Sequence, residues 1–168
     1  MRISRSLAFN IAAMIFIVDQ LVKFWIVQVL RLYSYVDGVV LLPFLKLTWG
    51  ENRGVSMGML TADGNIGRWM LVGLTALIAT GVGIWIMRSM AALERLALGL
   101  VLGGALGNIL DRIRFGYVVD FVHVHGQSWN FYVFNVADAA ITIGVLLLLV
   151  RALVQGDEPS APAQGGTD

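Results

Sequence analysis

Two aspartates in the second half of the sequence have the residue type and the setting for hydrolytic chemistry. Asp120 lies in the apolar run Val118-Val-Asp-Phe-Val122, where a solvated loop carboxylate is not expected, and Asp138 lies at the start of a long apolar stretch. Two carboxylates held together in a poorly solvated site do not both ionise easily, so one keeps a proton while the other can accept one from a bound water. The ionised carboxylate would act as general base on that water, and the protonated one would polarise a peptide carbonyl. The pair therefore indicates aspartyl peptidase chemistry.

Other polar side chains interrupt the apolar segments, and polar groups inside a membrane are costly and therefore candidates for function. They are Asp19, Lys23, Asn108, Asp111, Arg112 and Asn135. Structural explanations exist as well. Asp19 and Lys23 have the i,i+4 spacing of an ordinary helical ion pair, and Asn135 followed by Asp138 resembles a helix N-cap with an acidic residue in the first turn. Spacing alone leaves both kinds of role open.

A metal-dependent site is less favoured than the carboxylate pair. His123 and His125 alternate onto one side of a predicted strand, but two imidazoles without a firm third ligand make a poor metal site. The sequence contains no cysteine, which excludes disulfides, thiolate metal ligands and a cysteine nucleophile. We therefore expect neither metal nor cofactor. The formal net charge is +1 and there is no dense run of Lys or Arg, so nucleic acid is not expected as a partner.

The elements that position these residues must be surrounded by lipid. Of the 168 residues, 58% are apolar and only 14% are charged, whereas about 25% are charged in an average soluble protein. Mean hydropathy is +0.77. A hydrocarbon core of roughly 30 Å takes about 20 residues of helix. Four stretches qualify, at about 7–30, 67–87, 91–110 and 133–152. The predicted fold class is a membrane α-helical protein with four transmembrane helices.

Two longer connections are expected on one side of the membrane, at about 31–66 and 111–132. In the first, an alternating segment from Phe44 to Trp49 predicts a short strand with Pro43 near its start. The second contains the β-branched and aromatic segment 117–125, and pairing of the two would give a small β-sheet at the membrane interface. We expect residues 1–155 to form a single integral membrane domain, and the polar, Pro- and Gly-rich residues 156–168 to form a disordered tail.

Four glycines on the third predicted helix indicate close helix packing. Their spacing places a smooth strip along one side of the helix, where a neighbouring helix can approach. They are Gly99, Gly103, Gly104 and Gly107. A phosphate-binding loop is not favoured, because no strand precedes these glycines and no soluble helix follows them.

Four crossings place both termini on one side of the membrane and both longer connections on the other. The arginines on the terminal side are Arg2, Arg5, Arg88, Arg95 and Arg151. Several basic residues on the opposite side lie among the candidate site residues, so the positive-inside rule favours cytoplasmic termini. Every candidate polar residue then falls near the extracytoplasmic surface, where we predict the site.

Five segments of the chain carry a resemblance to a known family. They are Asp19-Gln-Leu-Val-Lys23, Glu51-Asn-Arg-Gly-Val-Ser-Met-Gly58, Gly103-Gly-Ala-Leu-Gly-Asn-Ile-Leu-Asp-Arg112, Val118-Val-Asp-Phe121 and Phe134-Asn-Val-Ala-Asp138. In this order, and on these expected helices and loops, they resemble the motifs of the bacterial lipoprotein signal peptidase family, also called signal peptidase II. The resemblance spans nearly everything except the two ends. Met57 departs from it, because an aromatic residue is common there.

The resemblance implies a multi-pass enzyme of the bacterial inner membrane with cytoplasmic termini and a site near the periplasmic face. It implies an aspartic endopeptidase that removes the signal peptide from diacylglyceryl-modified prolipoproteins by cutting before the lipidated cysteine. Asp120 and Asp138 match the catalytic pair. Residues matching the pocket for substrate and for globomycin-type inhibitors are Asn52, Gly54, Asn108, Arg112 and Asn135, and those matching supporting polar residues are Asp19, Lys23 and Asp111. Membrane lipid is the expected surrounding, and the expected state is a monomer.

Two other classes of protein were weighed against the peptidase. A small proton-coupled transporter or channel subunit also uses carboxylates within the membrane, but transporters usually place binding residues near the midplane, in broken helices related by repeats. A noncatalytic membrane scaffold would explain the glycine strip. It would not explain why so many carboxylates and amides lie at one depth.

Overall fold

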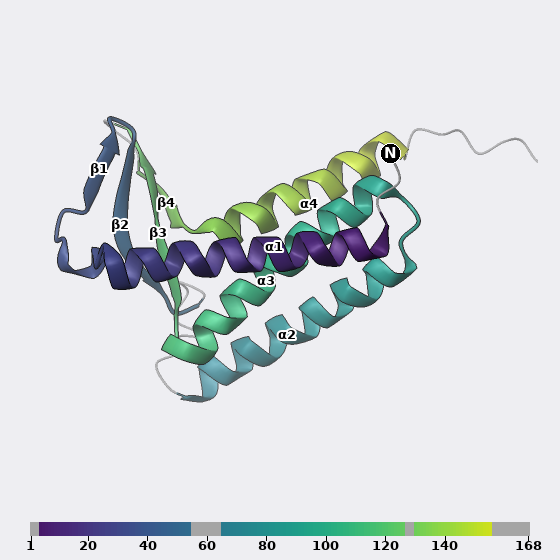
Figure 1. Cartoon of the computed structure of the whole chain (residues 1–168), viewed down its shortest axis with the longest axis horizontal. Coiled ribbons are helices and arrows are strands. Elements are labelled where there is room, and N and C mark those ends of the chain that lie inside the picture. Colours follow the sequence, from purple (N-terminus) through teal and green to yellow (C-terminus); the bar gives the residue numbers. More distant parts are fainter. Residues whose placement is uncertain (1–3, 55–64, 127–129, 156–168) are drawn as a thin grey trace, which may run out of the picture.

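The computed structural model describes residues 4–54, 65–126 and 130–155 and consists of a helical bundle with a small sheet at one end (Figure 1). Helix α1 (Arg5–Phe24) continues as a π-helical turn, η1 (Trp25–Val29). It is followed by α2 (Asn65–Arg88), α3 (Ala92–Phe115) and α4 (Val136–Gln155). Within the described ranges, four helical spans are long and apolar enough to cross a membrane. The predicted class of a multi-pass helical membrane protein is confirmed.

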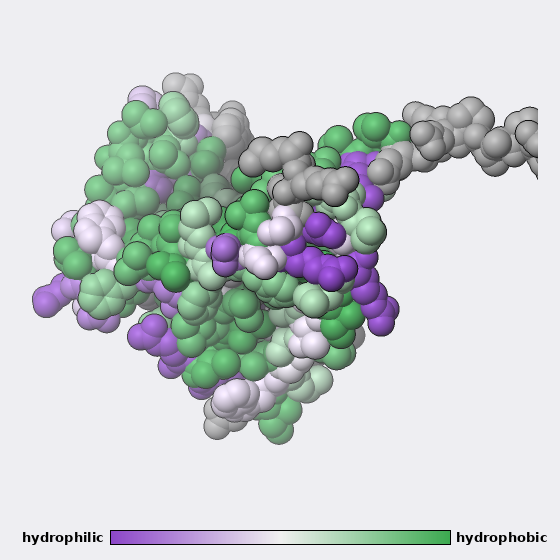
Figure 2. Space-filling view, turned by 45° about the vertical axis from the view of Figure 1, so that its right-hand side comes forward, coloured by the Kyte–Doolittle hydropathy of each residue, from purple (hydrophilic) through white to green (hydrophobic). Residues whose placement is uncertain are grey.

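Apolar side chains cover most of the bundle surface. Figure 2 shows hydrophobic residues over much of the visible face and hydrophilic residues gathered in a few patches. Large side chains such as Met14, Leu77 and Leu149 are more than half exposed. A soluble protein rarely exposes so continuous an apolar surface. Contact with lipid accounts for it.

Helix α3 lies at the centre of the bundle and packs against the other three helices. Its glycines permit the close approach that the sequence predicts. A Cβ atom at Gly99 would lie 2.7 Å from the carbonyl oxygen of Ala8 on α1. On the other side of the helix, a Cβ at Gly104 would collide with the carbonyl of Ala137 on α4. The strip therefore brings α1 and α4 into direct contact with α3.

Helix α3 runs further than the predicted range of 91–110. It ends at Phe115, where Gly116 adopts a left-handed conformation with φ of 84° and donates its N–H to the carbonyl of Arg112. Arg68 of α2 caps the same end, since its Nε lies 2.7 Å from the carbonyl oxygen of Arg112 and its Nη2 donates to the carbonyl of Ile113. Charged residues beyond 110 are compatible with the helix because Asp111 is paired with Lys23 of α1. Asp111 and Arg112 are consequently helical rather than part of a loop.

The sheet has four antiparallel strands in the order β1-β2-β3-β4. They are β1 (Val39–Leu42), β2 (Leu45–Asn52), β3 (Val118–His125) and β4 (Asn130–Phe134). The predicted pairing of the two connections is confirmed as β2 with β3. Pro43 lies in the turn just before β2, near the start of that strand as predicted, because it has no N–H to continue a strand ladder. One boundary differs from prediction, since the predicted fourth helix loses its first residues to β4.

Figure 1 shows the sheet at one end of the bundle and the N-terminus at the other end, beside the last turn of α4. A small core joins the sheet to the bundle, formed by Ile26 and Leu32 after α1 and by Val119 and Phe121 of β3. The sheet therefore holds β3 against the ends of the helices that carry the predicted site.

A second polar cluster closes the opposite end of the bundle. Buried Glu94 accepts hydrogen bonds from Trp85 Nε1 at 2.7 Å and Ser89 Oγ at 2.6 Å, and it pairs with Arg151 Nη1 of α4 at 2.6 Å. These contacts join α2, the loop before α3 and the end of α4, far from the sheet.

Candidate active site

The two predicted catalytic aspartates belong to one hydrogen-bonded cluster, joined by Asn135. Asp120 projects from β3, and Asn135 Nδ2 donates to its Oδ1 at 2.7 Å. Asn135 Oδ1 in turn accepts the backbone N–H of Asp138 at 2.9 Å. From the adjacent helix, Asn108 Nδ2 donates to Asp138 Oδ1 at 2.8 Å. The buried Asn135 thus contacts both aspartates, through the carboxyl group of Asp120 and the backbone N–H of Asp138.

Asn135 is also the N-cap of α4. The bond from the Asp138 N–H is matched by one from the Asn135 N–H to Asp138 Oδ2 at 3.4 Å, which is the reciprocal arrangement of a capping box. The predicted N-cap is therefore confirmed. Because Asp138 is tied to the cap on one oxygen and to Asn108 on the other, its carboxyl group has a fixed orientation in the first turn.

The electrostatic environment of Asp120 favours its protonated form. Its side chain is buried, and this burial, followed by the negative charge of Asp138, raises the pKa of Asp120 to about 6. Hydrogen bonds from Asn135 and from Asn52 at the end of β2 oppose the shift. A carboxyl group with a pKa raised in this way is able to change its protonation state nearer to neutral pH than an ordinary aspartate.

Lys23 pairs with two buried carboxylates behind the aspartates. Its Nζ lies 2.9 Å from Asp19 Oδ2 and 2.8 Å from Asp111 Oδ2, and all three side chains are at most 3% exposed. The predicted i,i+4 ion pair is confirmed, with Asp111 as an additional partner. Lys23 also donates to Asn108 Oδ1 at 3.3 Å, which connects this charged group to the amide that holds Asp138.

The carboxylates of this group fasten the two elements that carry the aspartates. Asp19 Oδ1 accepts the N–H of Ala137 in the first turn of α4 at 3.0 Å. Asp111 Oδ2 accepts the N–H of Val119, directly before Asp120, at 3.1 Å. The supporting role expected for these residues therefore corresponds to contacts with backbone groups next to both aspartates.

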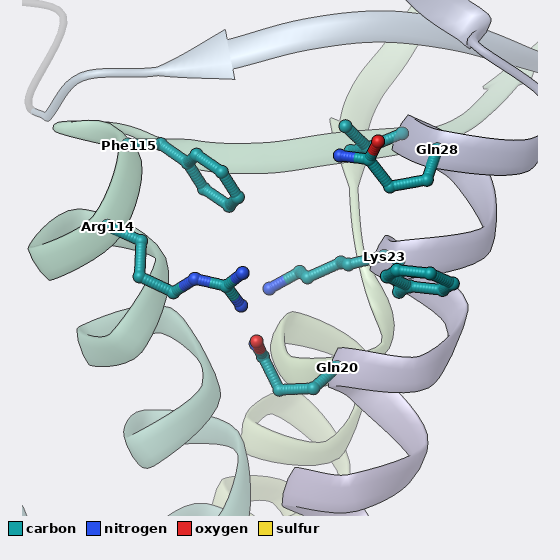
Figure 3. Close-up of a pocket in the computed structure, with 7 residues that line it drawn as sticks. Gln20, Lys23, Gln28, Arg114 and Phe115 are labelled. Carbon is teal, nitrogen blue, oxygen red and sulfur yellow. The ribbon is translucent and has the colours of Figure 1, made fainter.

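A small pocket of about 30 Å³ lies beside Lys23, between α1 and α3. Figure 3 shows Lys23 and Arg114 pointing toward one another, with Gln20 in the same space. Gln20 Nε2 lies 3.1 Å from Asp111 Oδ1 and 3.1 Å from Asp19 Oδ2. The pocket has room for about one water. Neither Asp120 nor Asp138 is among the residues that line it.

Arg112 and Gly54 are the remaining predicted pocket residues. Arg112 Nη1 donates weakly to the Asn108 carbonyl at 3.4 Å, while its buried Nε has no hydrogen-bond partner among the described residues. Its charge interacts with those of Asp120 and Asp138. Gly54, with φ of 128°, donates its N–H to Asn52 Oδ1 at 3.2 Å and shapes the turn after β2. Met57 lies outside the described residues.

Two adjoining clefts give access to the aspartates. One of about 470 Å³ exposes Asp138 and follows α4 past Ala139 to Ile143. The other, of about 310 Å³, exposes Asp120 beside Gly50. Both clefts are lined by the same two residues, Asn52 and Tyr132.

Sequence reasoning missed Tyr132 and Gly50. A signal for Tyr132 was present, because it is two residues before Phe134 and therefore shares a strand face with it. Gly50 pairs directly with Asp120 across β2 and β3, but only the register of the sheet reveals this. The register is set by an irregularity between Leu47 and Gly50, which alternation in the sequence does not indicate.

The two histidines lie further along β3, with ring centroids 5.6 Å apart. His123 Nδ1 is 3.5 Å from Thr48 Oγ1. Burial, Lys46 and His125 lower the pKa of His123. No group of three or more His, Cys, Asp or Glu side chains suited to a metal ion was found among the residues described.

Comparisons with known proteins place this site in a family. Residues 11–154 match the family described as Signal peptidase (SPase) II. The chain is 51% identical to the lipoprotein signal peptidase of Rhizorhabdus wittichii over 95% of this chain and 92% of that relative. It is 49% identical to the lipoprotein signal peptidase of Sphingopyxis alaskensis over 88% of this chain and 85% of that relative.

Two solved structures of bacterial membrane enzymes have the same fold. One superposes with a TM-score of 0.76 at 26% identity and covers 96% of this chain and 94% of its own. The other has a TM-score of 0.74 at 29% identity and covers 87% of this chain and 92% of its own. The resemblance carried by the five sequence segments is thus confirmed over nearly the whole length, and the chain belongs to the signal peptidase II family, the lipoprotein signal peptidases.

Proposed function

We propose that this chain is an intramembrane aspartic endopeptidase that removes the signal peptide from diacylglyceryl-modified prolipoproteins, cutting before the lipidated cysteine. Asp120 and Asp138 are the catalytic pair. The observation that carries this proposal is the single Asn135 side chain that bonds to Asp120 at 2.7 Å and to the Asp138 backbone at 2.9 Å. Adjoining clefts expose the two carboxyl groups to a substrate lying across them.

The reaction divides the proton-transfer roles between the two aspartates. Asp120, whose pKa is raised to about 6, carries a proton in the substrate-bound site and donates it to the carbonyl oxygen of the scissile peptide. A bound substrate excludes water and favours that protonated form further. Asp138, half-buried at the larger cleft, removes a proton from water, and the resulting hydroxide attacks the carbonyl carbon.

Collapse of the tetrahedral intermediate completes the cycle. The carbon–nitrogen bond breaks, and the proton held by Asp138 passes to the departing nitrogen, which becomes the amino group of the lipidated cysteine. Asp120 recovers its proton from the intermediate as the new carboxyl end of the signal peptide forms. The pair returns to its starting state with one water consumed, and no step requires a metal or cofactor.

The other polar residues hold the substrate and the pair. Asn52, Asn108 and Asn135 supply amides around the carboxyl groups. Arg112 presents a buried Nε without a partner in the described structure, so we assign it to a carbonyl of the bound peptide. Gly54 keeps the Asn52 side chain in place through its N–H.

The position of the site suits a substrate that arrives within the bilayer. The larger cleft follows α4 to Thr142 and Ile143, inside a membrane-spanning helix, and so can receive acyl chains laterally. We place the enzyme in the bacterial inner membrane as a monomeric domain of residues 1–155, with cytoplasmic termini and the sheet at the periplasmic face. Globomycin-type inhibitors would occupy the same clefts.

The test is cleavage of a lipidated prolipoprotein by the purified chain in detergent, with and without a chelator. We expect wild type to cut in both conditions. Asp120→Asn and Asp138→Asn should each abolish cleavage while the protein still inserts into membranes. Substantial turnover by either variant would overturn the assignment of the pair, and loss of activity with the chelator would overturn the metal-free reaction.

A further inference from the structure

Tyr132 stands at the junction of the two clefts. Its side chain is 63% exposed, although it belongs to the strand that leads directly into the capped end of α4. It lines both the cleft of Asp138 and the cleft of Asp120, and so does Asn52. A chain that reaches both carboxyl groups through these clefts therefore passes beside Tyr132 and Asn52.

The two clefts differ in what surrounds them. The Asp138 cleft includes Phe134 and Ile143 and continues along a membrane-spanning helix. The Asp120 cleft is formed by the sheet and includes Glu51 and Gly50. An apolar substrate segment is accommodated in the first, and a segment that leaves the membrane is accommodated in the second.

Gly50 keeps the Asp120 cleft open. It faces Asp120 across the strand pair, and a Cβ atom there would lie 3.5 Å from Asp120 Cβ and 3.7 Å from Val133 Cγ1. These are ordinary contact distances, so a side chain at this position fits the fold. It would nevertheless fill space beside the carboxyl group that a substrate side chain can otherwise occupy.

We propose that Tyr132 is a substrate-contacting residue that forms, with Asn52, the gate between two compartments, and that the compartment left open by Gly50 receives the side chain following the lipidated cysteine. The inference rests on the proposed function. The lipid of the cysteine lies in the apolar compartment, and the ring of Tyr132 covers the peptide between the compartments. Selectivity for the residue after the cysteine follows from the space at Gly50.

The first experiment measures kcat and KM for a lipidated prolipoprotein with wild type, Tyr132→Ala and Tyr132→Phe. Loss of the ring should raise KM at least tenfold with a smaller change in kcat, whereas Tyr132→Phe should stay within threefold of wild type because it keeps the contact area. Tyr35→Ala is the matched control, since Tyr35 is 46% exposed and lines neither cleft. A KM for Tyr132→Ala within twofold of wild type would overturn the gate.

The second experiment compares substrates with Gly or Phe after the lipidated cysteine. Gly50→Val should lower kcat/KM at least tenfold more for the Phe substrate than for the Gly substrate. Equal effects on both substrates would overturn the assignment of this compartment. Failure of wild type to cut either substrate would instead overturn the proposed function, so the two failures are distinguishable.

Discussion

At the scale of single residues, the candidate site uses the same side chains for structure and for chemistry. Asn135 caps α4 through Asp138 and bonds to Asp120. Lys23 neutralises the buried carboxylates of Asp19 and Asp111, which also accept backbone N–H groups of α4 and β3. Structural and functional explanations of these residues are therefore not alternatives, because the structural contacts orient the reactive groups.

Removal of Lys23 should destabilise the protein strongly. Lys23→Met leaves Asp19 and Asp111 buried without a positive partner, which typically costs about 3–5 kcal/mol. We expect a lower midpoint of thermal unfolding in detergent. The control is the triple variant Lys23→Met, Asp19→Asn, Asp111→Asn, which should recover part of the loss because no charge remains buried. A triple variant less stable than Lys23→Met would contradict the explanation.

The ionisation of Asp120 should make stability depend on pH. Its pKa is raised from 3.8 to about 6, so the folded state favours the protonated carboxyl. That contribution is complete below about pH 3.8 and is lost as the pH rises through about 6. Asp120→Asn, which stays neutral, should therefore unfold at a higher temperature than wild type at pH 7.5. The expected gain in the free energy of unfolding is on the order of 2–3 kcal/mol.

The same comparison at pH 4 provides the control for Asp120. The difference between Asp120→Asn and wild type should nearly vanish there, because the wild-type carboxyl is protonated. Asp37→Asn, at an exposed position, should unfold at the same temperature as wild type at both pH 4 and pH 7.5. A stabilisation by Asp120→Asn that is equal at pH 4 and pH 7.5 would refute the burial argument.

At the scale of helices and strands, close packing of α3 sets the positions of the neighbouring elements. Gly104→Ala should push α4 away, because the added Cβ collides with the carbonyl of Ala137 and lies 2.8 Å from Ile141 Cγ1. The expected cost is about 1–3 kcal/mol, accompanied by reduced cleavage since Asp138 moves with α4. Thermal unfolding and kcat/KM check both effects.

Gly81→Ala is the matched control for Gly104→Ala. No atom lies within 4 Å of a Cβ at Gly81 among the contacts described for that site. Alanine is the better helix former by about 0.5–1 kcal/mol, so stability should be unchanged or slightly higher. Comparable losses in both variants would show that glycine flexibility matters rather than packing space.

Sequence patterns predicted the helices well and the strands only in part. Long apolar runs identify membrane helices because lipid demands them, and the limits of α1 together with η1, and of α2, fall close to the predicted ones. The start of α4 differs from the predicted position, because the β-branched and aromatic residues of β4 continue into the helix without a change in hydropathy. Pro43 lies near the start of β2 as predicted, but the separate strand β1 before it was not predicted.

The candidate site was predicted in composition but not in geometry. The motif residues gather as expected, including Asn52 from the end of β2. The bond from Asp19 to the Ala137 N–H and the position of Tyr132 between the clefts depend on helix crossing and strand register. Neither is encoded in a local pattern.

At the scale of the whole molecule, the sheet and the start of α1 lie at opposite ends of the bundle (Figure 1). The absence of cysteine from the sequence makes this arrangement testable with single-cysteine variants. Asp37→Cys, near the sheet, should react with a membrane-impermeant maleimide added to spheroplasts. Arg88→Cys, at the end of α2 that lies away from the sheet, should react only after the cells are lysed. The reverse pattern would invert the proposed orientation.

The bond between Asp19 and Ala137 joins residues 118 positions apart, from the first membrane helix to the last. During synthesis on the ribosome, α4 is the last of these helices to be translated. A nascent chain that has inserted only three helices lacks Asp138, its cap and the partner of Asp19. With Asp138 in the proposed catalytic role, a chain truncated before α4 has no hydrolytic activity, and activity begins only once the final helix has been made.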